Sequence, residues 1–244
     1  MKLKSAIKYQ AFDSIKPLVI FYAIIYAIII LIYTIDKQYS ISGYVSGLET
    51  TSMVFIFIFG ILTFNAPFKL FLQNGISRRT CFFSIIITLM GVAVLMSGID
   101  NINYFIEKNL MAYQSIFDQI YCQQYLADSV LKSLRSWSWA WFFTIYWGIA
   151  MLGLLISTLY YRMNNWQKIV VSIGVPVGLF VVIPIISSAI TNGALLQAIM
   201  KFFSFAFGLS NGFNPHIAVI FNLLFIVILA AINYLLIRRA TIKE

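Results

Sequence analysis

Six stretches of mostly apolar residues dominate the chain, and polar segments separate them. They cover residues 17–35, 51–68, 81–97, 139–159, 169–190 and 216–237. A helix needs about 20 predominantly apolar residues to cross the hydrocarbon core of a bilayer, and the third stretch reaches that length with a residue or two more at either end. The pattern predicts an all-α polytopic membrane protein, in which residues 1–244 form one transmembrane domain with six transmembrane helices.

The segment before the first stretch, residues 1–16, has a helical pattern of its own. Leu3, Ile7, Ala11 and Ile15 recur every four residues among several lysines. A basic amphipathic segment of this kind lies along a membrane surface, so we expect an N-terminal interfacial helix. Pro17 would then occupy the first turn of the first span, where its missing N–H costs nothing. The alternative is a frayed, partly ordered tail.

Residues 99–137, between the third and fourth stretches, contain neither Gly nor Pro. Their apolar residues recur at spacings of three and four, namely Ile102, Phe105, Ile106, Leu110, Tyr113, Phe117, Ile120 and Tyr121. This spacing is typical of an amphipathic helix. We expect one long or two short extracellular helices covering the outer mouth of the protein; alternatively, they only lie on the outer leaflet.

Residues 191–215, between the fifth and sixth stretches, are strongly apolar and carry a single charge, Lys201. About 14 apolar residues are too few to span a bilayer and favour an extracellular re-entrant or interfacial helix. Phe202, Phe203 and Phe205 are therefore candidates for an extracellular gate. The alternative is an outer-leaflet helix without a gating role.

Composition and charge support a membrane protein of defined orientation. The chain is 61% hydrophobic and 10% charged, against about 25% charged residues in a soluble domain. With the N-terminus inside, twelve of the 17 Lys and Arg residues fall on inside segments, as the positive-inside rule requires. We expect a multi-pass protein of the cell membrane with both termini cytoplasmic. The basic residues form no long run, so the net charge of +9 does not indicate a nucleic-acid partner.

The sequence offers little catalytic chemistry. The six stretches contain no Asp, Glu, Lys or Arg, and there are only two Cys and one His in the chain. Intramembrane ionisable residues mark proton relays and voltage sensors, so these classes are disfavoured. Cys81 and Cys122 fall on opposite sides of the bilayer and cannot pair within the chain. No phosphate-binding loop of the G-x-x-x-x-G-K-[ST] type occurs. We expect neither an enzyme nor a metal or cofactor site, and any energy for transport must come from a separate subunit.

The short inside segment 69–80 is the most informative connection. Asn74-Gly75 is typical of a helix C-terminus, and Ser77 can cap the helix that follows. The second helix should therefore run past Phe68, break at Asn74-Gly75 and restart, forming a basic elbow. Its apolar members need a surface to bury against, which favours a docked partner; the alternative is a plain positive-inside loop. The candidate docking residues are Leu70, Phe71, Asn74, Gly75, Ile76, Ser77, Arg78 and Arg79.

Polar and helix-bending residues within the stretches suggest a second candidate site. Asn222 and Asn233 are 11 residues apart, close to three helical turns, so they share a face of the sixth helix. They either make interhelical hydrogen bonds or line a translocation path. Pro176 and Pro184 should kink the fifth helix, where Gly174 and Gly178 allow close approach.

This layout resembles the permease subunits of ABC-2 type (type V) ABC transporters. The string from Gln73 to Arg79 is similar to the corresponding loop in small permeases of Gram-positive bacteria, which serve in peptide export or antimicrobial-peptide immunity. The resemblance implies that the elbow is a coupling helix that docks on an ABC ATPase subunit, and that this partner subunit binds ATP and magnesium. It also implies a second permease copy, as a homodimer or a paralogous heterodimer.

The function that the resemblance implies is outward movement of a hydrophobic or amphipathic substrate, such as a peptide. A different class of function stays open: a non-transporting membrane sensor or scaffold that binds peptides through its extracellular segment. Co-purification of an ATPase would favour the permease.

Overall fold

The computed structural model describes residues 2–39, 45–110, 113–122, 135–189, 191–210 and 212–240. These residues are helical almost throughout, as expected for an all-α protein. The exception is a two-residue bridge, in which β1 (Val45–Ser46) runs parallel to β2 (Tyr113–Gln114).

Six helical units in the described residues are long and apolar enough to cross a membrane, which confirms the number expected. They are α1 (Lys2–Tyr39), α2 (Leu48–Gln73), α3 (Arg78–Leu110), α5 (Ser138–Arg162), the unit formed by α6 (Asn165–Val177), η2 (Gly178–Val182) and α7 (Ile183–Ala189), and α9 (Pro215–Arg238). Two shorter helices, the π-helical η1 (Asp118–Cys122) and α8 (Ala194–Ala206), complete the fold.

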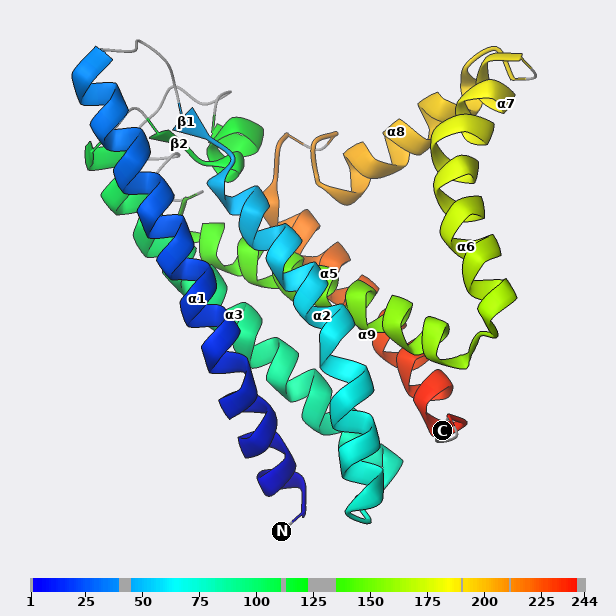
Figure 1. Cartoon of the computed structure of the whole chain (residues 1–244). Helices are drawn as coiled ribbons and strands as arrows, with labels where there is room; N and C mark the ends of the chain where they lie inside the picture. The colour runs from blue at the N-terminus through cyan, green and yellow to red at the C-terminus, as the bar shows by residue number, and fades with distance from the viewer. Residues whose placement is uncertain are drawn as a thin grey trace.

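Five of these helices form a bundle in which α5 is central and packs against α2, α3 and α9, while α1 lies along α3 (Figure 1). Glycines let α2 and α5 approach backbone to backbone. A Cβ atom at Gly60 would run into the carbonyl oxygen of Ala150, and one at Gly153 would run into that of Phe57. Small residues at the contact are the usual device for close helix packing in membranes, where apolar surface alone gives no preference for protein over lipid.

The N-terminal segment differs from the expectation. The prediction of a separate helix over residues 1–16 is wrong, because α1 runs without interruption from Lys2 to Tyr39 with Pro17 inside it. The buried face of the early part carries Ala6, Gln10 and Ser14 rather than the predicted apolar stripe. The hydroxyls of Ser84 and Thr88 on α3 both donate to Oε1 of Gln10, at 2.9 and 3.3 Å. These polar contacts hold the segment against α3.

The third helix is longer than its apolar stretch, which ends at Ser97. It continues to Leu110, so the first part of the predicted extracellular segment 99–137 belongs to α3. Residues 116–122 are also helical, whereas 113–114 form the bridge with β1. The rest of that prediction, residues 123–134, lies outside the described residues.

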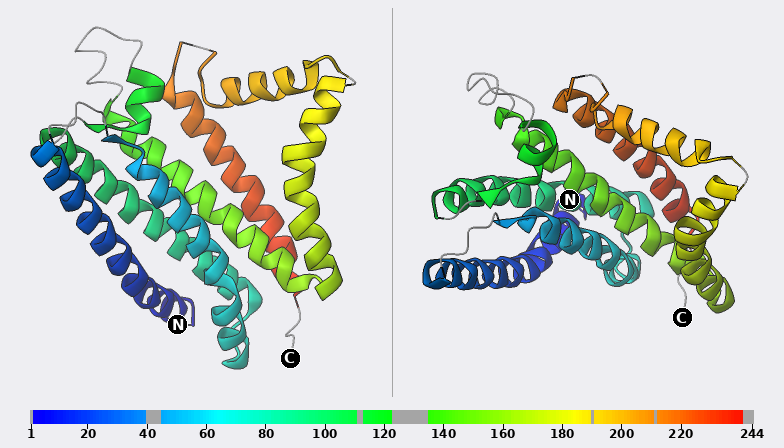
Figure 2. Two further views of the ribbon diagram at one scale, coloured as in Figure 1. Left: turned by 45° about the horizontal axis from the view of Figure 1, so that its top comes forward. Right: turned by 90° about the horizontal axis from the view of Figure 1, so that it is seen from above.

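The unit formed by α6, η2 and α7 stands away from the bundle, and α8 runs back from its end towards α9 (Figures 1 and 2). We call residues 165–189 the arm. No residue of α6 or η2 is buried, and only Ser187 is buried in α7. The π-helical turn Gly178–Val182 lies between Pro176 and Pro184, so the helix continues past both prolines. Nothing lies within 4 Å of the position that a Cβ would take at Gly174 or Gly178.

Candidate functional site

The elbow between α2 and α3 has the backbone that its sequence predicts. Gly75 has a φ of 68°, and the N–H groups of Gly75 and Ile76 donate to the carbonyl oxygens of Leu72 and Phe71 at 3.0 and 2.9 Å. This pair of bonds is a Schellman motif, which ends a helix with its last carbonyls satisfied. The N–H of Thr80 donates to Oγ of Ser77 at 3.2 Å, so Ser77 caps α3 as expected.

The apolar residues of the elbow are covered mainly by the chain itself. Phe71 is only 3% exposed, and its ring meets the ring of Tyr9 on α1 edge-on at 6.0 Å. Ile76 is partly buried against the core, and Leu70 is half-buried. The inference that these residues need a partner to bury them is therefore wrong for Phe71, because the extension of α1 to Lys2 supplies the missing surface.

What the elbow exposes is polar and basic. Asn74, Gly75, Ser77, Arg78 and Arg79 are all exposed. Arg78 donates through Nη1 to the carbonyl oxygen of Arg238 at 3.2 Å, where α9 ends. The elbow lies at the end of the molecule that also holds the start of α1 and the end of α9 (Figure 2). It is thus a rigid basic projection whose position is fixed by both neighbouring helices.

The two asparagines of α9 have different environments. Asn233 is completely buried; its amide donates to the carbonyl oxygens of Leu229 and Met151, and its Oδ1 accepts from Thr158 at 3.1 Å. A side chain held in this way joins α9 to α5, as the interhelical alternative expects, and its role in lining a path remains a prediction. Asn222 is half-buried, and its amide nitrogen has no hydrogen-bond partner in the described chain.

The three candidate gate phenylalanines lie on α8, at the end of the molecule opposite the elbow (Figure 1). Phe202, Phe203 and Phe205 are each more than half exposed, and Ala206 is the only residue of α8 that is buried. The ring of Phe202 meets that of Phe221 on α9 edge-on at 5.6 Å. Their role as a gate remains a prediction.

A buried polar cluster that the sequence reading missed ties the bundle together near the opposite end from the elbow. Asp100 on α3 accepts hydrogen bonds from the hydroxyls of Tyr22 on α1 and Tyr146 on α5, at 2.9 and 2.6 Å. One turn along, the hydroxyl of Tyr26 donates to Asn103 at 2.9 Å. The cluster therefore fixes α1, α3 and α5 relative to one another.

Two further carboxyl groups belong to this cluster. Glu49, in the first turn of α2, accepts from the hydroxyl of Tyr113 at 2.6 Å. Glu107 on α3 is 3% exposed and lines a small cavity together with Glu49 and Asp100. No Lys or Arg is among the described residues that line this cavity, and no described group of three His, Cys, Asp or Glu residues is arranged to hold a metal ion.

A sequence signal for this cluster exists. The buried residues of α3 recur at spacings of three and four from Leu89 through Ala93 and Met96, and the same rhythm continues through Asp100, Asn103 and Glu107. The last three are polar and lie beyond Ser97, where the apolar stretch ends. The apolar stretch alone therefore does not show that they belong to the same helix face. Helical periodicity, followed regardless of residue polarity, would have found them.

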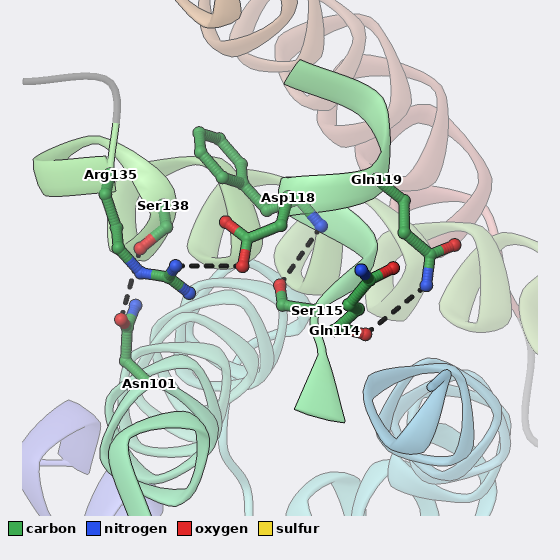
Figure 3. A network of polar contacts seen from close by, with 8 residues as sticks. Asn101, Gln114, Ser115, Asp118, Gln119, Arg135 and Ser138 are labelled. Carbon is green, nitrogen blue, oxygen red and sulfur yellow. Dashed lines mark hydrogen bonds and ion pairs between the residues drawn. The ribbon is translucent and has the colours of Figure 1, made fainter. Parts of the chain in front are cut away.

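A layer of polar contacts joins α3, the segment that follows it and the start of α5 (Figure 3). Asp118 forms an ion pair with Arg135 at 2.8 Å, and the guanidinium of Arg135 stacks on the ring of Tyr104 at 3.2 Å. The hydroxyl of Tyr121 donates to the carbonyl oxygen of Phe207 at 2.8 Å, which joins this layer to the loop after α8. Burial, and then the nearby Asp118, raise the pKa of the Cys122 thiol to about 12.

Comparisons with known proteins add no family to this description. No protein-family model, curated protein or solved structure matches the chain.

Proposed function

We propose that the chain is the membrane-embedded permease subunit of an ABC transporter of the ABC-2 type. It moves a hydrophobic or amphipathic substrate, such as a peptide, outward, and a separate subunit hydrolyses ATP with magnesium. A second permease, identical or paralogous, completes the pathway, with both termini of each chain on the cytoplasmic side of the cell membrane.

The observation that carries the proposal is the elbow. Its Schellman turn and Ser77 cap make it rigid, and its exposed surface is basic. Residues 69–80 project at one end of the bundle (Figure 1). A rigid basic projection fits a carboxylate-lined groove on a soluble partner, because Arg anchors are common hot spots of protein interfaces.

The mechanism follows from how the elbow is held. When the ATPase dimer closes on ATP, it pushes on the exposed face that includes Arg79. The displacement passes directly into α3 and, through Phe71 and Tyr9, into α1. Both helices also meet at Asp100 near the opposite end. A push at the elbow is thereby transmitted to the far end, where the substrate would leave.

The test separates docking from folding by using Arg79, which is exposed, rather than Phe71, which is part of the core. The tagged chain is purified from its native membranes, and the vanadate-sensitive ATPase activity that accompanies it is measured. Arg79→Glu should reduce the recovered ATPase about thirtyfold, since losing a hot spot costs about 2 kcal/mol. The matched control is Lys201→Glu, an equal charge reversal on exposed α8.

Normal recovery of the ATPase with Arg79→Glu would leave the elbow as a topogenic positive loop. Absence of any Walker-motif protein from the wild-type preparation would favour the sensor or scaffold instead.

A further inference from the structure

A cavity of about 730 Å³ lies between α2 and the turn from α5 to α6, at the end of the molecule that carries the elbow. The residues that matter for its chemistry are Asn65, Lys69, Tyr160, Asn164, Asn165 and Lys168. They come from two segments far apart in the sequence, α2 and the turn between α5 and α6, so the fold brings them together.

The cavity is positively charged. Lys69 and Lys168 face it from different helices, and no carboxylate lines it among the described residues. The ion pair Asp118–Arg135 is at the opposite end of the molecule. Helix α6 begins at Asn165, in the wall of the cavity, where the helix dipole favours an anion. The side chains of Asn164 and Gln167 form a capping box at this helix start, so its N3 N–H group is already bonded. Two ammonium groups and a helix start therefore converge on one space.

The surface that continues from the cavity is apolar and uncovered. Trp166 is 74% exposed, and Ile169, Val170 and Ile173 along α6 are each more than half exposed. An exposed Trp beside basic residues is typical of the level of lipid headgroups. An occupant that satisfies both parts must have an anionic head and an apolar tail.

We propose that this cavity binds the phosphate headgroup of an anionic phospholipid, such as phosphatidylglycerol, whose acyl chains lie along the exposed face of α6. Lys69 and Lys168 neutralise the phosphate, and the amides of Asn65, Asn164 and Asn165 offer further donors. Basic pockets between transmembrane helices recognise acidic headgroups by this chemistry. The site joins the base of the arm to the bundle through lipid, in a place where the arm has almost no protein contacts. The proposal requires only that the chain lies in a membrane, and it is independent of the transporter assignment.

The experiment is native mass spectrometry of the purified full chain in detergent, with phosphatidylglycerol and phosphatidylcholine of the same acyl chains added in equal amounts. The wild type should retain phosphatidylglycerol at least tenfold more than phosphatidylcholine. The double variant Lys69→Gln with Lys168→Gln should lose this preference. Lys8→Gln with Lys201→Gln removes the same charge from exposed positions elsewhere and should retain it.

Further measurements identify what the cavity recognises. The melting temperature without added lipid should be the same for the double variant and the wild type, which shows that both are folded. If inorganic phosphate at millimolar concentration protects the wild type as well as phosphatidylglycerol does, the apolar tail is irrelevant and the lipid proposal is overturned. Equal retention of phosphatidylglycerol by the double variant would also overturn it. In that case, a loss of co-purifying ATPase would assign the cavity to a protein partner.

Discussion

The pair formed by α2 and α5 and the arm formed by α6, η2 and α7 contrast sharply. The arm is the more apolar of the two, yet no residue of its most apolar part is buried, whereas more than half of the corresponding part of α5 is. The α2–α5 contact is made through Gly60 and Gly153, and α5 also carries Tyr146 and Thr158 into buried hydrogen bonds. Between these two regions, burial follows small and polar residues, and the more apolar region faces outward.

The contrast predicts its largest effect at glycine. Gly153→Ala should destabilise the bundle by about 3 kcal/mol, the upper part of the range for overpacking, because the new Cβ meets the backbone of α2. Gly174→Ala on the arm, where a Cβ meets nothing within 4 Å, should leave stability unchanged or slightly raised. Thermal unfolding of both variants in one detergent is the measurement. Equal melting temperatures would mean that the α2–α5 contact is looser than described.

A smaller effect is expected from single hydroxyls. Tyr146→Phe removes one of the two tyrosine donors to buried Asp100, and loss of a partner to a buried charged group costs about 1–3 kcal/mol. Tyr160→Phe breaks the exposed contact with Ser172 at the base of the arm and should change stability by less than about 0.5 kcal/mol. Denaturant or thermal unfolding of the two variants compares them directly. A larger loss of stability for Tyr160→Phe than for Tyr146→Phe would mean that contacts of the arm contribute more to stability than those of the bundle.

Thiol reactivity gives the smallest and most local comparison. At pH 8 a thiol with a pKa of about 12 is almost entirely protonated, so Cys122 should react slowly with an impermeant maleimide, at a rate that rises about tenfold per pH unit. Ser188→Cys, in a Cys122→Ser background, places a thiol on the exposed face of α7 and should react much faster.

The same labelling in intact cells tests the orientation. Cys81 is completely buried near the elbow end and should not react from outside. Labelling of Cys81 without labelling of Cys122 would contradict the placement of both termini in the cytoplasm.

The parts of the fold that local chemistry determines were predictable. The apolar stretches give the six long helices, and Asn74-Gly75 with Ser77 gives the elbow, because turn and cap propensities act over a few residues. The N-terminal segment departs from the expected pattern because Leu3 and Ile15 are exposed, while Gln10 and Ser14 are buried. In a water-soluble protein a helix buries its apolar face. In a membrane helix the buried face depends on the neighbouring helices instead, so the apolar stripe does not identify it.

In the candidate site, too, some features follow from local sequence and others depend on residues far apart in the chain. The backbone of the elbow follows from its own residues, but the burial of Phe71 depends on Tyr9, more than 60 positions earlier in the chain. The cluster around Asp100 combines residues from four helices and the segment after α3, and no local pattern encodes the meeting of Tyr22 with Asp100. The exposed arm, in turn, could not be recognised from its sequence, since a lipid-facing helix and a core helix are both simply apolar.

The unbroken course of α1 has a mechanical consequence. At a rise of 1.5 Å per residue, its 38 residues form a rod about 57 Å long, nearly twice the thickness of the hydrocarbon core. Tyr9 touches the elbow near one end, and Tyr26 is bonded to Asn103 about 25 Å further along the axis. Pivoting about its middle by about 10°, such a rod carries each tip through about 5 Å. α1 is thus a lever that rests on Phe71 near its start and is held near its middle, where Tyr22 bonds to Asp100 and Tyr26 bonds to Asn103.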